Sequence, residues 1–392
     1  MPLPLYPLAL AVFAMGTSEF MLAGLLPDIA SGLGVTVGTA GMLTSAFATG
    51  MIVGAPLMAG CARNRPGRSS LLGFVLVFLA AHAVGAATSS FPVLLTTRVV
   101  AALANAGFLA VALTTAVTLV PADRKGRALA VLLSGTTVAT VAGVPGGSLL
   151  GTLLGWRATF WAVAALCLPA AVGILTGIPA RPAGADEADG PTLRAELAQL
   201  TSPRLLLVMS LGALVNAATF AGFTFLAPVV TGTAGLGELW ISVVLVLFGA
   251  GSFGGVIVAG RLSDQRPGLV LAVGGPLLLI GWPALALLAD RPAALLVLAF
   301  VQGALSFALG STLITRILYE AAEAPAMAGS YATAALNVGA AAGPLIAAPT
   351  LGTAAGDLGP LWASGLLVAL ALLVAFPLRT VLVAGRSGEA LR

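Results

Sequence analysis

The feature that most constrains this chain is a succession of long apolar runs, separated by short segments of charged, proline or glycine residues. Runs of roughly 20 apolar residues can cross a hydrocarbon layer about 30 Å thick as a helix. Only 8% of the residues are charged and the mean hydropathy is +1.07, whereas soluble domains carry about 25% charged residues. A water-soluble globule cannot bury so much apolar surface, so the sequence predicts a chain folded in a lipid bilayer.

Dividing the sequence at these breaks predicts an all-α integral membrane protein of twelve transmembrane helices. A polar linker at 179–203, expected in the cytoplasm, separates an N-terminal six-helix bundle, residues 1–178, from a C-terminal six-helix bundle, residues 204–392. The first run begins beside Met1 without a basic flank, so we expect it to be retained as helix 1 and not cleaved as a signal peptide. The predicted helices are 5–26, 39–60, 70–88, 92–118, 128–150, 158–178, 204–230, 239–260, 268–289, 292–316, 327–350 and 358–378.

The positions of the basic residues test this helix count, because Lys and Arg concentrate in cytoplasmic loops. Of the 18 basic residues, fifteen fall in the loops of one side or in the C-terminal tail. Only Arg157 and Arg291 fall in the opposite loops, and Arg98 lies within a predicted helix. A missing or extra helix would scramble this alternation, so we expect both termini in the cytoplasm.

The two halves also repeat each other. The tripeptide Arg-Pro-Gly at 65–67 recurs at 266–268, and Pro27 recurs as Pro228, both at an offset of 201 residues. Parallel repeats of six helices are typical of transporters that rock two bundles about a central site. Channels and enzymes do not need this symmetry.

Several other functions are excluded or disfavoured. The basic residues are spread over many short loops, so the pI near 9.7 does not indicate nucleic-acid binding. One histidine and two isolated cysteines, Cys61 and Cys167, indicate neither a metal site nor a disulfide framework. The G-x-G-x-x-G letters at 249–254 lie within a predicted helix and no P-loop is present, so we expect no nucleotide cofactor. An intramembrane enzyme would need a paired nucleophile and base, which we do not find.

Residues 16–20 (GTSEF) and 24–30 (GLLPDIA) resemble the twelve-span drug:proton antiporters of the major facilitator superfamily, and the resemblance covers nearly the whole chain. They are most similar to the branch of sugar, purine and chloramphenicol exporters, and within it to the chloramphenicol-resistance exporters of actinomycetes. The resemblance implies a monomeric transporter in a bacterial cytoplasmic membrane. It implies export of a small apolar drug, chloramphenicol first, in exchange for protons by alternating access. Export of a sugar or a purine nucleoside is the alternative.

Two sets of residues resemble the superfamily's conformational motifs. The loop signature after helix 2 has asparagine in place of the usual carboxylate, and its echo after helix 8 keeps the acid. We expect these loops to latch the cytoplasmic helix ends, the alternative being a basic turn that serves topology alone. Helix 5 carries a glycine-proline cluster typical of antiporters, with a weaker echo at Gly339, Gly343 and Pro344 in helix 11. The candidate residues are Gly60, Asn64, Arg65, Gly67 and Arg68, then Asp264 and Arg266, and in helix 5 Gly143, Pro145 and Gly147.

Three ionisable residues inside predicted helices are candidates for proton coupling, because a charge at mid-bilayer costs about 2.5–3.5 kcal/mol and is kept for function. Glu19 in helix 1 is the candidate proton carrier, or else a structural carboxyl between helices. Arg98 in helix 4 would tune a nearby carboxyl, water or substrate, or else reach toward the outer interface. His82 in helix 3 is a possible relay, although a hydrogen-bonded packing role is favoured.

Uncharged polar and aromatic residues in the helices are candidates for drug contact. The polar ones have a second interpretation, as hydrogen bonds between helices worth about 0.6 kcal/mol each. The aromatic ones have a second interpretation as core or lipid-facing residues. These candidates are Asn105, Asn216, Gln302 and Asn337, and Phe20, Phe47, Phe220 and Phe223.

Overall fold

The computed structural model describes residues 3–62, 67–121, 125–179, 199–265, 267–321 and 327–375, and these contain helices and no strands. Twelve helices among them are long and apolar enough to cross a membrane, by length and composition. The prediction of an all-α, twelve-helix membrane protein is confirmed.

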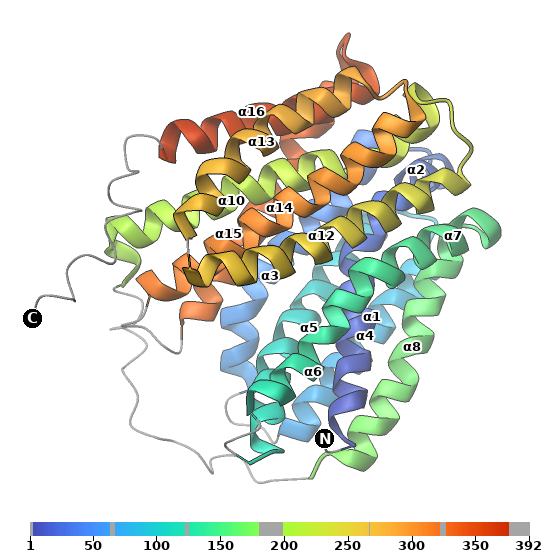
Figure 1. The fold of residues 1–392 in the computed structure, drawn as a ribbon. Helices are drawn as coiled ribbons and strands as arrows, with labels where there is room; N and C mark the ends of the chain where they lie inside the picture. The colour runs from blue at the N-terminus through green and yellow to red at the C-terminus, as the bar shows by residue number, and fades with distance from the viewer. Residues whose placement is uncertain are drawn as a thin grey trace, which may run out of the picture. The chain divides into compact units, whose positions relative to one another are not determined.

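The described helices form two compact units. One unit comprises residues 1–190, 224–231 and 237–246, and the other comprises the remainder of the chain. The first half of the chain folds as α1 (Leu5–Phe20), α2 (Leu26–Leu33), α3 (Val37–Ala62), α4 (Gly67–Ala87), α5 (Phe91–Thr118), α6 (Lys125–Val138), α7 (Val144–Leu154) and α8 (Trp156–Gly177). The second half folds as α10 (Pro203–Thr224), α11 (Leu226–Pro228), α12 (Leu239–Gln265), α13 (Pro267–Leu287), α14 (Pro292–Glu320), α15 (Ala328–Ala347) and α16 (Gly359–Ala375) (Figure 1).

Within each unit the helices pack pairwise. In the first unit, α1 packs against α6 and α8, and α5 packs against α3 and α4 (Figure 1). In the second unit, α13 packs against α14 and α16, and α15 also contacts α14 and α16. Large apolar side chains such as Leu366, 72% exposed, remain uncovered by protein. Such residues on long apolar helices fit a surface that faces lipid.

The predicted single helix at 5–26 is broken. It consists of α1, a 3₁₀ turn η1 (Met21–Gly24) and α2, which closes at Gly34 in the left-handed conformation (φ +65°). Pro27 has no backbone N–H and its ring crowds the preceding turn, which favours a break in the helix just before it. Proline is instead accommodated at the start of α2. The break leaves the last carbonyls of α1 without α-helical partners.

The fifth predicted transmembrane helix, 128–150, is also interrupted. It consists of α6 and α7 with a π-helical turn, η3 (Ala139–Gly143), between them. Pro145 follows at the start of α7. A π turn adds a residue to one helical turn and recurs at functional sites. The glycine-proline cluster therefore lies where the backbone departs from α-helical geometry.

The sequence repeat is also a repeat of close helix contacts. A β-carbon on Gly50 would approach the Val99 carbonyl oxygen of α5 to 2.9 Å, and Gly54 faces Leu103 one turn later. In the second unit, 201 residues on, β-carbons on Gly251 and Gly255 would overlap the carbonyl groups of Phe300 and Ala304 in α14. Each half of the chain thus uses two glycines to bring two helices into backbone contact, α3 with α5 in the first half and α12 with α14 in the second.

Candidate functional site

The three predicted coupling residues lie near one another in the first unit, where Ser18 joins His82 to Arg98 and Glu19 interacts with Arg98 through its charge. The name Arg98 cluster is used here for Ser18 and Glu19 on α1, His82 on α4 and Arg98 on α5. The Arg98 side chain is 1% exposed, and its two terminal nitrogens donate to the hydroxyl oxygen of Ser18 at 2.7 Å and to its carbonyl oxygen at 2.8 Å. Arg98 is therefore turned inward and does not reach for the outer interface.

The hydrogen bonds of His82 define its tautomer. Its Nδ1 lies 2.8 Å from the Phe78 carbonyl oxygen, which can only accept, so Nδ1 carries a hydrogen. Its Nε2 lies 2.6 Å from the Ser18 hydroxyl oxygen, which already accepts from Arg98 and so donates its own hydrogen to Nε2. A neutral imidazole satisfies every partner. Both ring nitrogens are engaged, as the packing role would require.

The positive charge of Arg98 is compensated mainly by uncharged groups. The guanidinium carbon lies 4.5 Å above the centre of the Phe47 ring, an arrangement in which the ring face attracts a cation. Ser18 lies in the last turn of α1, where the carbonyl ends of the peptide dipoles favour a cation. The Nε atom of Arg98 is buried and has no hydrogen-bond partner among the described residues.

Glu19 follows Ser18 in the chain and is half-buried. Its charge interacts with that of Arg98, yet no direct ion pair joins the two side chains in the described structure. A carboxyl group near a fixed cation, but not locked to it, can both hold and release a proton.

A second acidic residue lies beyond the membrane span, in α2. Burial and the neighbouring Glu238 carboxylate raise the pKa of Asp28 above its usual value. Asp28 thus lies close to a second carboxylate, beyond the end of the first membrane span.

The predicted aromatic candidates are only partly brought together. Phe47 lies beneath Arg98, so its ring is engaged in the Arg98 cluster. In the second unit the rings of Phe220 and Phe223 are 6.3 Å apart, and Phe223 packs on Phe248 at 4.9 Å, which in turn meets Phe307 at 6.4 Å. The candidates chosen from the sequence did not include Phe248 or Phe307. The repeat signals Phe248, because the offset of 201 maps Phe47 onto it.

The predicted polar candidates largely bond to backbone. The Asn216 amide donates to the Leu336 carbonyl oxygen of α15 at 2.6 Å, which ties two helices together. The Asn337 amide donates to Thr333 in its own helix. Gln302, 0% exposed, makes a long 3.4 Å bond to Leu278, and its side-chain oxygen has no partner among the described residues. Asn105 is buried on α5 and Phe20 half-buried at the end of α1.

The glycine-proline cluster packs against helix 1. A β-carbon on Gly143 would overlap the Thr17 hydroxyl, and one on Gly147 would meet the Thr159 methyl of α8 at 3.0 Å. A cavity of about 190 Å³ lies between α1, the η3–α7 segment and α8, and Thr17, Gly143 and Gly147 contribute to its lining. These contacts form a seam between α1, which carries Glu19, and the interrupted helix made of α6, η3 and α7.

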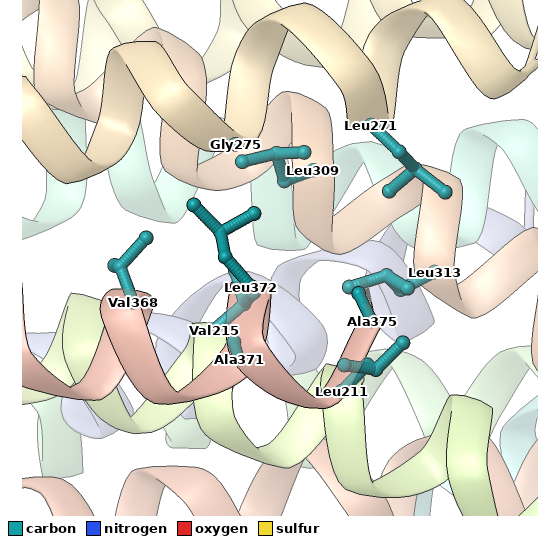
Figure 2. A pocket seen from close by; sticks show the side chains of 10 residues that line it. All are labelled: Leu211, Val215, Leu271, Gly275, Leu309, Leu313, Val368, Ala371, Leu372 and Ala375. Carbon is teal, nitrogen blue, oxygen red and sulfur yellow. The ribbon is translucent and has the colours of Figure 1, made fainter. Parts of the chain in front are cut away.

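A cavity in the second unit is a packing gap and not a drug site. It has a volume of about 60 Å³, whereas ligand pockets usually span about 300–1,000 Å³. Figure 2 shows that its lining is purely apolar, and none of the predicted drug-contacting residues is part of it. The lining residues are Leu211, Val215, Leu271, Gly275, Leu309, Leu313, Val368, Ala371, Leu372 and Ala375.

With this geometry in hand, comparison with known proteins identifies the family. Residues 8–344 match the model of the family described as Major Facilitator Superfamily. The chain belongs to this superfamily. It is accordingly a multi-pass membrane transporter and not an enzyme.

Relatives within the superfamily are close. The chain is 80% identical over 392 residues, all of both chains, to a chloramphenicol resistance protein of Streptomyces lividans. It is 33% identical over 340 residues to the inner membrane transport protein YdhP of Escherichia coli K12, covering 87% of this chain and 86% of that protein.

A solved structure agrees in fold. A bacterial homologue of the human lysosomal transporter Spinster, in an inward-facing and unoccupied conformation, matches with a TM-score of 0.75 and 17% identity. The match covers 96% of each chain. At this identity the likeness supports the superfamily's fold alone.

The superfamily's loop signature falls largely outside the described residues. Asn64, Arg65 and Arg266 lie there, and at Gly60 and Asp264 only the helical backbone is described. Gly67 begins α4 and Arg68 lies in its first turn. The latch therefore stays a prediction, as does most of the linker at 179–203. Among the described residues, no three His, Cys, Asp or Glu side chains gather to hold a metal ion.

Proposed function

We propose that this chain exports chloramphenicol from a bacterial cytoplasm in exchange for protons. The observation that most supports this proposal is the 80% identity of the chain, over its whole length, with a protein named for chloramphenicol resistance. We further propose that it works as a monomer by alternating access, with both termini in the cytoplasm. The predicted bundles at 1–178 and 204–392 would be the moving parts.

Glu19 is the proposed proton carrier. It is the acid within the first span, TM helix Leu5–Gly24, and it lies beside a fixed cation without being locked to it. A proton taken up from outside would neutralise Glu19, and its release inside would restore the carboxylate for the next cycle. Arg98 would hold a constant charge near Glu19, since guanidinium does not deprotonate in practice.

The membrane potential can drive this exchange. One charge moving through 100 mV supplies about 2.3 kcal/mol, and each 1.4 kcal/mol corresponds to a tenfold ratio. One proton per neutral drug molecule would therefore sustain roughly a fiftyfold gradient. A pH gradient would add to it.

The substrate is tested in cells that express the chain and in matched cells with an empty vector. Expression should raise chloramphenicol tolerance and lower chloramphenicol accumulation, and an uncoupler should abolish both effects. A labelled sugar and a labelled purine nucleoside are measured in the same cells. Unchanged chloramphenicol accumulation together with expulsion of either of these would replace drug export by the alternative.

A further inference from the structure

Ser18 is the residue through which three helices of the first unit meet. It is 0% exposed on α1, and its oxygens bond to His82 of α4 and to Arg98 of α5. A buried hydroxyl side chain commonly bonds its own helix, as that of Thr219 does with Val215. Ser18 instead carries both contacts that hold Arg98.

These contacts form a two-point clamp. The planar guanidinium presents two parallel N–H groups, and Ser18 offers its hydroxyl and carbonyl oxygens at 2.7 and 2.8 Å. The carbonyl is available because α1 ends at Phe20, two residues later. Glu19 is the next residue after Ser18, so one residue determines where the cation lies relative to the carboxyl.

The clamp also explains why Arg98 is not paired directly with Glu19. A buried guanidinium deprived of acceptors would turn to the strongest one nearby, a carboxylate. Ser18 accepts from both terminal nitrogens of Arg98, and the end of α1 and the Phe47 ring favour its charge, so that among described residues only Nε lacks a partner. Glu19 is thereby left free to exchange its proton.

We propose that Ser18 is a positioning residue for proton coupling, which holds Arg98 beside Glu19 but out of a permanent ion pair and keeps His82 neutral with its hydrogen on Nδ1. This inference rests on the proposed role of Glu19. Few other charges bear on it. Among the side chains that the structure describes on the elements packed against α1, the other charged or titratable ones are those of Arg157 at the start of α8 and the buried Cys167, whereas the side chains of Lys125 and Arg127 on α6 are not described. Among the described side chains, Arg98 is the one whose charge acts on Glu19.

The second half of the chain supplies a matched control. The offset of 201 maps Ser18, Glu19 and Arg98 onto Thr219, Phe220 and Ala299. Thr219 is equally buried, but its hydroxyl donates within its own helix. Removing the Thr219 hydroxyl perturbs an equivalent place in the repeat without touching a cation or an acid.

His82 reports the clamp directly, since it is the only histidine in the chain. In protein labelled with ¹⁵N-histidine and purified without a histidine tag, the spectrum should contain one neutral imidazole protonated at Nδ1. Ser18→Ala should move the Nε2 resonance toward that of an unbonded nitrogen and leave Nδ1 protonated. Thr219→Ala should move neither. An unchanged Nε2 resonance in Ser18→Ala would overturn the hydrogen-bond part of the proposal.

The coupling role is read from the pH dependence of proton-driven chloramphenicol exchange in proteoliposomes. Ser18→Ala removes the hydroxyl bond of the clamp and keeps the backbone carbonyl bond. The released nitrogen of Arg98 can then turn toward Glu19, so half-maximal exchange should move to lower pH by about half a unit or more. Ser18→Thr, which keeps the hydroxyl, should return the profile toward wild type, and Thr219→Ala should match wild type. If Ser18→Ala is not recovered as folded protein, Ser18→Cys gives the same test with a weaker donor.

Two failures are distinguishable in this assay. A Ser18→Ala profile equal to wild type, even at a lower rate, would reduce Ser18 to packing and leave the role of Glu19 intact. Wild-type pH dependence in Glu19→Gln, run alongside, would remove Glu19 from the mechanism, and the role of Ser18 would fall with it.

Discussion

At the scale of single residues, Arg98 shows how a membrane protein keeps a buried cation. Desolvating a guanidinium costs several kcal/mol, which attraction to a nearby group must offset. Here the compensation comes from the Phe47 ring, the Ser18 oxygens and the end of α1. The geometry of the guanidinium matters as much as its charge, because both clamp bonds need its planar fork.

Arg98→Lys tests this point. Lysine keeps the charge but loses the fork, so proton-driven export should fall at least about tenfold at equal protein level, a loss of about 1.4 kcal/mol. Arg157→Lys is the control, because Arg157 bonds Thr88 and stacks on Trp156 at the start of α8 and is not part of the Arg98 cluster. Equal export by wild type and Arg98→Lys would mean that a point charge suffices.

Part of this site could be predicted from the sequence. Glu19, His82 and Arg98 stand out because ionisable residues are rare inside apolar runs. Ser18 does not, because serine is common in membrane helices and its role depends on how three helices are rotated about their axes. Phe248 could have been found by applying the repeat to Phe47. The backbone bonds of Asn216 and Asn337 could not, since sequence does not say which carbonyl a side chain reaches.

At the scale of elements, glycine sets how closely helices approach. The predicted helix ranges agree with the structure except where backbone geometry changes. The sequence did not predict the break after Phe20 or the π turn at Ala139–Gly143. It also missed the end of α10 at Thr224, within the helix predicted at 204–230, and the second π turn at Val229–Thr233, which overlaps the end of that range. Proline at 27 and 145 indicates an interruption, but the conformation that absorbs it depends on the packing of neighbouring helices.

In the seam between α1 and helix 5, Gly143→Ala should destabilise the protein by about 1–3 kcal/mol, because its β-carbon overlaps Thr17. Gly146→Ala, three residues on, meets nothing within 4 Å and should change stability by less than about 0.5 kcal/mol. Thermal unfolding of the purified protein in detergent measures both. Equal unfolding midpoints for Gly143→Ala and Gly146→Ala would contradict close packing between α1 and Gly143.

The glycines at 249–254 give a second element-scale prediction. Gly251→Ala should lower the unfolding temperature, because its β-carbon overlaps the Phe300 carbonyl, whereas Gly254→Ala, with open space around it, should not. Helix packing, and not nucleotide contact, thus explains Gly251. Measurable binding of NAD or ATP that either variant weakened would restore the fingerprint interpretation.

At the scale of the whole molecule, the repeat and the charge distribution made the fold predictable. Apolar runs define the helices, and the placement of basic residues checks their number. Substrate identity was not encoded in the same way, because small residues and scattered polar groups line many kinds of transporter. It rested on resemblance, and the near relative supports that assignment.

The orientation remains to be measured with reporter fusions. A fusion at Gly34 should read external, and fusions at Gly184 and Ala390 should read cytoplasmic. The reason is that fifteen basic residues lie in the C-terminal tail and in loops on the side of Gly184, and basic residues concentrate in the cytoplasm. An external reading at Ala390 would mean an odd number of spans and would contradict the two-bundle arrangement.

Uphill drug transport in vesicles with an imposed pH gradient tests the central claim, that proton exchange at Glu19 drives drug export. Glu19→Gln keeps the size and polarity of the side chain and removes its titration, so the variant should insert, fold and bind chloramphenicol. Wild-type vesicles should concentrate the drug against its gradient, and Glu19→Gln vesicles at equal protein level should at most equilibrate it. Undiminished concentration of chloramphenicol by Glu19→Gln would contradict the account.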